Sequence, residues 1–309
     1  MIVTVTMNPA VDRTVWLDHL EKGGLNRILS KKTDVGGKGI NVSKTIHTLG
    51  LKSIATGLIG GKSGRMIERV LQEQGIHTDF VRIEGNNRIN TKVAETDGSV
   101  TELNELGPHI SEEELNDLLQ KLYQYAAEDT MFVFSGSVPD GVSDEFYELA
   151  IKMVHQKGAK VFLDADRMLL KRGLKAKPDF LKVNQKELET LCGKKISDAK
   201  EAAILGLQLL DEGVGFVAIS LGAEGAVFLS QNVCVRCPGL KVPIVSTVGA
   251  GDGMVGALVS SWEEGISFEA GIRLAMAVSA AAVTTQGTRP ADQMMVMKLY
   301  QKVKFEQIQ

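Results

Sequence analysis

The residue with the clearest chemical potential is an aspartate behind a glycine turn, in the string Gly249-Ala250-Gly251-Asp252. A strand-like apolar run precedes this string over 242–248, and a run of small and apolar residues follows over 254–262, so we expect strand, turn and helix. Glycines let a ligand approach the backbone, and the unpaired N–H groups that start a helix attract an anion such as phosphate. Asp252 then has two interpretations: a cap of the helix, or a general base for a hydroxyl that attacks the phosphate.

A second glycine string surrounds a lysine, in Gly36-Gly37-Lys38-Gly39-Ile40-Asn41. It precedes a helix-like run and indicates another place where backbone lies close to an anion. Its spacing is not that of a dinucleotide-binding G-x-G-x-x-G turn. Gly61-Lys62-Ser63 resembles the end of a P-loop, but Thr56 rather than glycine stands five residues before Gly61, so we interpret it as a turn with a helix cap at Ser63.

Two further strings follow strand-like segments. Asn184 and Glu187 come directly after the apolar run 181–183. They have the form of a capping box, and they are also suited to organise Mg²⁺ and its waters, since this ion needs few protein ligands. Ser220, Gly222, Glu224 and Gly225 follow the run 216–219 and suit a loop that passes close to a nucleotide, although the same pattern occurs in a simple glycine turn.

The intervening segments alternate between strand-like and helix-like patterns. We expect strands over 2–6, 54–59, 131–134, 161–163, 180–183 and 216–219, and helices over 41–49, 63–74, 111–127, 143–155 and 198–212. Ser111 and Glu114 form a capping box at the start of one of these helices. Such alternation predicts a parallel sheet covered by helices, and such sheets bind ligands at the carboxyl ends of their strands.

Two stretches, about 12–35 and 88–106, interrupt the alternation with period-two patterns. Asp97-Gly98 in the second stretch predicts a hairpin turn. We expect a small separate sheet that acts as a lid over the site, as a dimerisation flap, or as both. An outer face carrying Val15, Leu17, Ile28 and Val93 would be buried in a dimer.

Composition limits the classes of function. The formal net charge is −3 without a basic block, which argues against a nucleic-acid or membrane-surface role. The N-terminal residues do not resemble a signal peptide, and the longest fully apolar run, 274–278, is too short to cross a bilayer, so we expect a cytoplasmic protein. Cys234-x-x-Cys237 has the spacing of half a zinc site, but the sequence offers no second ligand pair, so we interpret both as reduced thiols.

Taken in order along essentially the whole chain, these strings resemble the PfkB sugar kinases. The segment 36–41 resembles the N-terminal signature of that family, and 248–253 resembles the core of its C-terminal signature. Thr6-Met7-Asn8-Pro9-Ala10-Val11-Asp12 and Arg88-Ile89-Asn90 resemble the branch that acts on phosphorylated ketohexoses. The resemblance implies one ribokinase-like domain over 1–309, a three-layer α/β/α sandwich with a mainly parallel sheet and a small β lid.

The resemblance also implies roles for individual residues. Asp252 corresponds to the catalytic base, and Gly249, Ala250 and Gly251 to the anion hole for the transferred phosphoryl group. The substrate-binding positions are Asp12, Gly37, Lys38, Asn41, Arg88 and Asn90, among which Arg88 and Lys38 suit the phosphate already on the sugar. The nucleotide positions are Asn184, Ser220, Gly222, Glu224 and Gly225, and Asn184 with Glu187 corresponds to the motif that acts on Mg²⁺ through water.

The expected reaction is therefore ATP- and Mg²⁺-dependent phosphorylation of fructose 1-phosphate to fructose 1,6-bisphosphate. The alternatives are tagatose 6-phosphate, or an unphosphorylated sugar or nucleoside, which Arg88 disfavours. A non-catalytic metabolite sensor on the same fold is the alternative from another class. The expected partners are a sugar phosphate, ATP and a second copy of the chain, which would pair through the lid.

Overall fold

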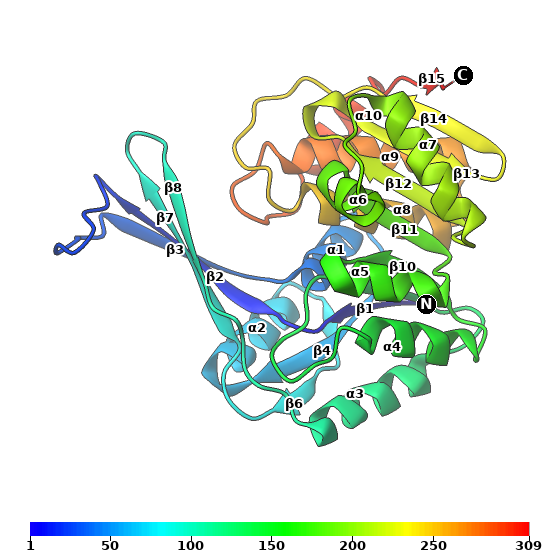
Figure 1. Cartoon of the computed structure of the whole chain (residues 1–309). Coiled ribbons are helices and arrows are strands. Elements are labelled where there is room, and N and C mark those ends of the chain that lie inside the picture. The colour runs from blue at the N-terminus through cyan, green and yellow to red at the C-terminus, as the bar shows by residue number, and fades with distance from the viewer. Residues whose placement is uncertain (309) are drawn as a thin grey trace.

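The computed structural model describes residues 1–308, and one large sheet runs through its centre (Figure 1). The strand order is β15 (Glu306–Gln307), β14 (Val233–Cys237), β13 (Ala226–Ser230), β12 (Phe216–Ser220), β11 (Phe180–Asn184), β10 (Lys160–Asp164), β9 (Met131–Ser135), β1 (Ile2–Thr6), β4 (Ile54–Gly60) and β5 (His77–Thr78), with β6 (Val81–Ile83) also paired to β4. From β12 to β5 all neighbours are parallel, and β13, β14 and β15 add an antiparallel edge. The predicted mainly parallel sheet is confirmed.

Helices cover both faces of this sheet, because its strands are apolar on both sides. Phe132 and Phe134 of β9 belong to the core beneath α3 (Glu112–Tyr125), α4 (Phe146–His155), α5 (Arg167–Gly173), α6 (Gln185–Cys192) and α7 (Ala199–Asp211). Met131 and Val133 point to the opposite face, where α1 (Lys38–Thr48) and α8 (Ala250–Glu263) pack. The helices α2 (Gly61–Glu73), α9 (Phe268–Ala282) and α10 (Gln293–Tyr300) complete the outer layers. The expected three-layer α/β/α architecture is confirmed.

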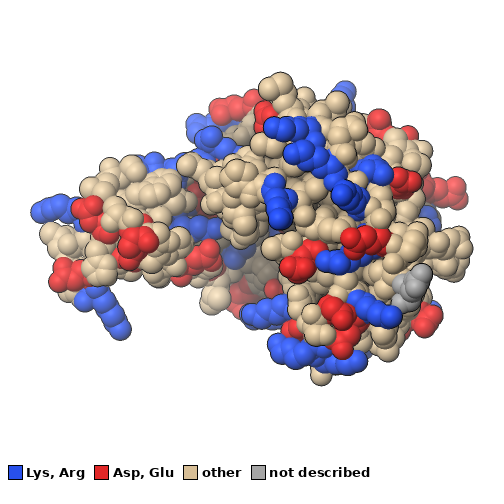
Figure 2. Space-filling model, turned by 90° about the horizontal axis from the view of Figure 1, so that it is seen from above, with Lys and Arg blue, Asp and Glu red and all other residues tan. Residues whose placement is uncertain are grey.

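A second, four-stranded sheet projects from the main body (Figures 1 and 2). Its order is β3 (Ser30–Gly36), β2 (Ala10–Leu17), β7 (Arg88–Glu95) and β8 (Val100–Asn104). We call these four strands the β arm. The β7–β8 connection turns at Gly98, whose N–H donates to the carbonyl of Glu95 at 3.0 Å and whose φ of +89° suits glycine. Both stretches that interrupt the strand–helix alternation therefore form strands outside the main sheet.

The apolar residues of the β arm are distributed differently from the prediction. Val15, Leu17 and Val93 are buried in a small cluster beneath Leu20, because the segment after β2 folds over them. Of the four residues expected on an outer apolar face, only Ile28 is exposed, at 55%. Other large apolar side chains are exposed on the arm or its edges: Leu25, Leu29, Val100, Leu103 and Leu106.

The segment 242–248 is not a strand, so this prediction is wrong. Pro243 has no N–H to donate, and Ile244 is mostly exposed. The N–H groups of Val245 and Ser246 both donate to the carbonyl of Val283, at 2.8 and 3.2 Å, rather than to a neighbouring strand. The segment therefore reaches the glycine turn as an irregular loop packed against the end of α9.

The predicted helix cap at Ser63 is also wrong. Helix α2 begins at Gly61 with Gly60 as its N-cap residue, two residues earlier than expected. The side chain of Asn86 accepts from the N–H of Lys62 at 2.7 Å, which satisfies one of the free donors of the first turn. The hydroxyl of Ser63 instead donates to the carbonyl of Asn87 at 2.7 Å.

The surface agrees with the near-neutral composition. Figure 2 shows acidic and basic side chains mixed over the visible face, which is hollowed where the β arm meets the body. Over residues 1–308, no helix is both long enough and apolar enough to cross a bilayer.

Candidate functional site

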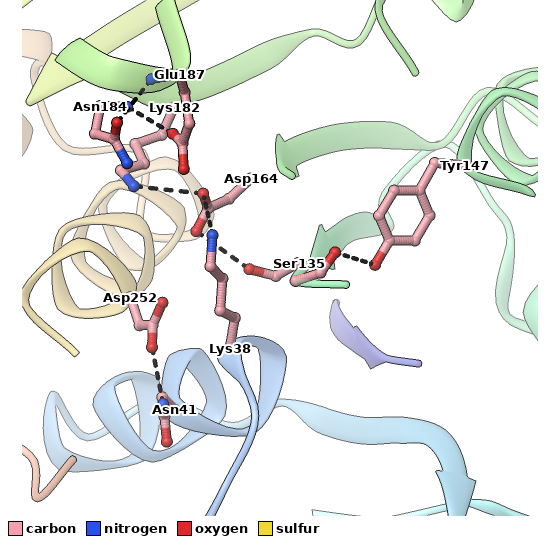
Figure 3. Close-up of polar contacts among 10 residues, drawn as sticks. Lys38, Asn41, Ser135, Tyr147, Asp164, Lys182, Asn184, Glu187 and Asp252 are labelled. Atoms are coloured by element: carbon pink, nitrogen blue, oxygen red, sulfur yellow. Dashed lines mark hydrogen bonds and ion pairs between the residues drawn. The ribbon is translucent and has the colours of Figure 1, made fainter. Parts of the chain in front are cut away.

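Several polar residues, some of them predicted from the sequence, gather at one edge of the main sheet. Ser135, Asp164, Asn184 and Ser220 are the last residues of four neighbouring parallel strands, β9 to β12. The N-terminal ends of α1 and α8 face the same edge, and Figure 3 shows their side chains pointing toward one another. Parallel strands bring their carboxyl ends together, so residues far apart in sequence meet there.

Asp252 lies in the first turn of α8 and is 7% exposed. The N-cap residue of this helix is Gly249, in the left-handed conformation at φ +84°, and no side chain caps it. The helix-cap interpretation of Asp252 is therefore wrong. Its Oδ2 atom instead accepts a hydrogen bond from Nδ2 of Asn41 at 2.8 Å. Burial, reinforced by the charge of Asp164, raises the pKa of Asp252 to about 6.

The backbone N–H groups at the start of α8 form the candidate anion hole. Gly249 turns the chain into the helix, and Ala250 and Gly251 occupy its first two positions. A Cβ atom at Gly251 would lie 2.9 Å from Nζ of Lys182, so glycine leaves room for an ammonium group beside these N–H groups. A buried cation and a helix N-terminus then favour an anion at the same place.

Asp164 connects the cations of the site. Its carboxylate is fully buried, and Oδ1 accepts from Nζ of Lys38 at 3.2 Å and from Nζ of Lys182 at 3.4 Å. The hydroxyl of Ser135 donates to Oδ2 at 3.3 Å (Figure 3). Burial acts to raise the pKa of Asp164, but Lys182 and Lys38 outweigh it and hold this pKa below its ordinary value.

Lys38 lies among several carboxylates. Burial acts to lower its pKa, but Asp164, then Glu187 and Asp252, outweigh burial and raise it, so Lys38 carries its charge at neutral pH. Arg88 has a different neighbour: the carboxylate of Asp12 acts to raise the pKa of Arg88, against the effect of burial. Lys38 and Arg88 therefore lie among different carboxylates.

Sequence analysis missed three residues of this site: Ser135, Asp164 and Lys182. Ser135 and Asp164 are the last residues of mostly apolar strands, and Lys182 is the middle residue of β11. Lys182 in Phe180-Leu181-Lys182-Val183 was the available signal, because lysine is rarely buried unless it is paired. Its partner Asp164 lies on the neighbouring strand β10, and a single sequence does not reveal such a pairing.

A second polar group surrounds the base of the β arm. Asp12 on β2 accepts a hydrogen bond from Nδ2 of Asn90 on β7 at 3.1 Å, and burial raises the pKa of Asp12. Buried oxygens of four nearby side chains have no hydrogen-bond partner within residues 1–308: Thr6, Asn8, Asn41 and Asn90. Buried polar atoms are normally paired, so these unpaired oxygens make this region a candidate ligand site.

Glycines at the start of α1 keep this place open. A Cβ atom at Gly36 would lie 2.6 Å from Oδ2 of Asp12, and one at Gly37 would lie 2.6 Å from Cγ2 of Thr6. Gly37 also has a φ of +120°, which other residues rarely adopt. The backbone can therefore approach a ligand held between α1 and the arm.

Arg88 begins β7 at the base of the arm and is partly buried. Its Nε donates to the carbonyl of Asn8 at 3.2 Å, and burial lowers its pKa. It lines a surface pocket together with Asn86, Leu106 and His109. The guanidinium is thus anchored through one nitrogen at the rim of the polar group around Asp12.

Asn184 and Glu187 form the predicted capping box of α6. The side-chain oxygen of Asn184 accepts from the N–H of Glu187 at 2.9 Å, and Oε2 of Glu187 accepts from the N–H of Asn184 at 2.7 Å. This box uses only one carboxylate oxygen of Glu187. The other is a hard oxygen donor of the type that Mg²⁺ or its waters prefer, so the residues present fit the metal.

A dense metal cage is absent from the part of the chain that the structure describes. There, no three side chains of His, Cys, Asp or Glu are placed to hold one ion. A metal at this edge would therefore keep most of its waters, as Mg²⁺ commonly does.

The expected nucleotide loop follows β12. Ser220 ends the strand. Gly222 begins a short 3₁₀ turn with a φ of +60°, and Gly225 follows the turn with a φ of +100°. A Cβ atom at Gly225 would lie 2.0 Å from the carbonyl oxygen of Cys237, so glycine is required there. The exposed carboxylate of Glu224 lies 3.5 Å from the guanidinium of Arg236, so its partner is on β14.

Comparison with known proteins agrees with this geometry. Residues 5–294 match the family described as pfkB family carbohydrate kinase. The chain is 34% identical over 309 residues to a 1-phosphofructokinase of Haemophilus influenzae, which covers 100% of this chain and 99% of the relative. A crystal structure of phosphofructokinase-2 from Escherichia coli in complex with potassium superposes with a TM-score of 0.92 at 27% identity, covering 97% of this chain and 98% of that one.

The fold extends to a more distant protein. The structure of Arabidopsis thaliana ribokinase complexed with ribose and ATP gives a TM-score of 0.80 at 22% identity, covering 97% of this chain and 98% of that chain. This likeness shows the shared architecture, so the fold is ribokinase-like.

Proposed function

Because this chain belongs to the pfkB family of carbohydrate kinases, we propose that it transfers the γ-phosphoryl group of ATP to fructose 1-phosphate, forming fructose 1,6-bisphosphate and ADP. The full-length relative named 1-phosphofructokinase supports this substrate. The observation that carries the proposal is a buried carboxylate, Asp252, in the first turn of a helix whose N-terminus faces a pair of ammonium groups. Tagatose 6-phosphate remains the second candidate substrate.

Asp252 serves as the general base in this proposal. With a pKa of about 6 it is mostly ionised at neutral pH and still basic enough to accept a proton from a hydroxyl. The hydrogen bond from Asn41 fixes the carboxylate on the side of α1. The free C6 hydroxyl of fructose 1-phosphate gives its proton to Asp252 as its oxygen bonds to the γ-phosphorus. The bond from that phosphorus to the β–γ bridging oxygen breaks, and ADP leaves with the electron pair.

The charge that develops on the transferred group is met by groups that are already in place. The N–H groups of Gly249, Ala250 and Gly251 supply the anion hole, and the ammonium of Lys182 lies against Gly251. Lys38 reaches the same edge from α1. We therefore assign Lys38 to the transferred phosphoryl group rather than to the phosphate already on the sugar. Such preorganised donors need little rearrangement during the reaction.

Mg²⁺ fits beside Asn184 and Glu187. When bound, the ion supplies electrostatic neutralisation of the ATP phosphates. Glu187 would then have two tasks, since one of its oxygens completes the capping box and the other would be available to the ion or its waters. Ser220, Gly222, Glu224 and Gly225 form the proposed nucleotide loop, in which the glycines leave the backbone accessible.

The polar group at the base of the β arm suits the sugar. Asp12, Asn41 and Asn90 offer hydrogen-bonding atoms to hydroxyl groups, and Gly37 allows a close approach. Arg88 supplies the positive charge for the phosphate already present on C1. In this proposal the β arm is a lid, because an active site for phosphoryl transfer must exclude water.

We also propose that two copies of the chain pair through their β arms. The arm exposes several large apolar side chains, with Leu25 at 77% and Leu106 at 85%, among others on β8 and the β2–β3 connection. Exposed apolar groups gathered on one projecting element are typical of an association surface. This face replaces the one predicted from Val15, Leu17 and Val93, which the arm buries itself.

The first prediction concerns the substrate. In a coupled assay of ADP release, turnover is expected with fructose 1-phosphate and is expected to be lower with tagatose 6-phosphate, fructose 6-phosphate and ribose. Arg88→Ala should weaken the binding of fructose 1-phosphate by about 2 kcal/mol or more, because the phosphate of the sugar loses its charged partner. This loss corresponds to a rise of roughly 30-fold in the KM for fructose 1-phosphate. The KM for ATP should change much less.

The matched control is Arg82→Ala, which removes an exposed arginine paired with Glu68. Equal rises in both KM values for Arg88→Ala would make Arg88 a structural residue of the arm. No ATP turnover with any sugar phosphate would leave the sensor as the better interpretation.

The second prediction separates the two tasks of Glu187. Glu187→Gln and Glu114→Gln both alter a capping box, at α6 and α3, and each should cost about 1 kcal/mol or less of unfolding free energy in a denaturant titration. Only Glu187→Gln should raise the Mg²⁺ concentration that gives half-maximal rate, because only Glu187 faces the active site. Identical Mg²⁺ dependence of the two variants would leave Glu187 with the capping role alone.

The third prediction concerns the oligomer. Leu103→Glu places a charge on the exposed face of β8, where Leu103 is 58% exposed, and should shift sedimentation at micromolar concentration from dimer to monomer. The control is Leu149→Glu on α4, whose leucine is 53% exposed and lies outside the arm. The pairing would be refuted if the native protein sediments as a monomer. It would also be refuted if Leu103→Glu still sediments as a dimer.

A further inference from the structure

Tyr147 on α4 is a fully buried polar residue that the proposed mechanism does not use. Its hydroxyl donates to the carbonyl oxygen of Gly136 at 3.1 Å (Figure 3). Burial, followed by the charge of Asp164, raises the pKa of Tyr147, so the phenol keeps its proton and acts as a donor. Phenylalanine would fill the same space without a polar atom, so the hydroxyl needs a reason beyond packing.

The ring of Tyr147 is firmly held. Its centroid lies 5.6 Å from that of Phe134 at an interplanar angle of 55°, and 6.0 Å from that of Phe146 at 52°. Both tilted geometries are favourable for aromatic pairs. A ring packed on two sides has little rotational freedom, so its hydroxyl defines a fixed point inside the protein.

That fixed point holds the residue that follows β9. Gly136 has a φ of +96°, its N–H donates to the backbone carbonyl of Asp164 at 3.0 Å, and its carbonyl accepts from Tyr147. Both peptide groups of Gly136 are therefore anchored, one to β10 and the other to α4. Without these anchors a glycine has more backbone conformations available than any other residue.

The side chain of Lys38 passes the open side of Gly136. A Cβ atom on Gly136 would lie 3.5, 3.7 and 3.9 Å from Cβ, Cγ and Cδ of Lys38, which is ordinary van der Waals contact. The methylene groups of Lys38 therefore pass over this glycine, and the ammonium group reaches Asp164 at 3.2 Å. Ser135, the neighbour of Gly136, holds the other oxygen of that carboxylate.

We propose that Tyr147 is a positioning residue for Lys38, acting through the peptide of Gly136 rather than by touching a substrate. This inference rests on the proposed function, in which Lys38 acts on the transferred phosphoryl group. Removal of the hydroxyl frees the Gly136 carbonyl, which loosens the hydrogen bond from the Gly136 N–H to the backbone of Asp164. The carboxylate of Asp164 then no longer holds the ammonium of Lys38 in one position.

The test is a double-mutant cycle on kcat. Tyr147→Phe should lower kcat by about 10- to 100-fold, the effect of a small misplacement, with little change in either KM. In the background of Lys38→Met, which keeps the stem and removes the ammonium, Tyr147→Phe should lower kcat no further. Tyr125→Phe is the matched control, because it deletes a hydroxyl that binds Asp79 at 2.6 Å, away from the site.

A second readout does not depend on turnover. Limited acetylation by acetic anhydride, followed by peptide mass spectrometry, reports the reactivity of the Lys38 amine. In the native protein the pairing with Asp164 should protect Lys38, and Tyr147→Phe should raise its labelling rate several-fold while Tyr125→Phe leaves it unchanged. Thermal melts of all variants show whether each one is folded.

Support for the proposal requires faster labelling of Lys38 together with a kcat loss that disappears in Lys38→Met. The proposal is overturned if Lys38 in Tyr147→Phe is labelled at the same rate as in the native protein, or if the kcat of Tyr147→Phe stays within twofold of the native value. It is also overturned if Tyr147→Phe lowers kcat equally with native Lys38 and with Lys38→Met. If the native protein shows no kinase activity, the proposed function is refuted. The labelling rates of Lys38 then still decide whether Tyr147 fixes the position of Lys38.

Discussion

The site depends on one buried carboxylate between two ammonium groups. Asp164 is fully buried, and it accepts from Lys38 of α1 and Lys182 of β11. An isolated charge in such a place costs several kcal/mol, so the buried Asp164 and Lys182 depend on their ion pair, and the partly exposed Lys38 adds a second one. Together these three groups carry one net positive charge, which the nearby carboxylate of Asp252 offsets when it is ionised. The groups that attract an anion at this edge are therefore the two ammonium groups and the N–H groups that begin α8.

The same network sets the protonation of Asp252. Burial and the charge of Asp164 raise its pKa, whereas Lys38 and Lys182 lower it, and the balance lies at about 6. Without the lysines the pKa of Asp252 would be higher, and a larger fraction of the carboxylate would be protonated at neutral pH and unable to accept a proton. With a more exposed carboxylate, the pKa would approach the ordinary value of an aspartate and the base would be weaker. A modestly raised pKa suits a base that works at neutral pH.

Local patterns predicted much of the architecture and part of the site. The strand-like runs around Phe132 and Val217 and the capping boxes at Ser111 and Asn184 lie where the sequence indicated, because each depends on neighbouring residues. The role of Asp164 depends on contacts between strands and helices, which one sequence does not show. The expected strand over 242–248 failed because apolar residues form a strand only where another strand offers a free edge, and Ile244 instead lies exposed. The strands of the β arm could be predicted from their alternating polar and apolar residues. That Leu20 covers one apolar face of the arm could not be predicted in this way.

The most direct test of this account is the pH dependence of kcat for fructose 1-phosphate, measured from about pH 5 to 8 at saturating MgATP. Protonated Asp252 cannot accept the hydroxyl proton, so kcat should be level above the pKa of about 6 and fall below it by about tenfold per pH unit. Asp252→Asn should fold and bind both substrates but lose at least about 10²-fold in kcat, without this acid limb. A native kcat that is flat down to pH 5, or near-native turnover by Asp252→Asn, would contradict the role of Asp252 as the base.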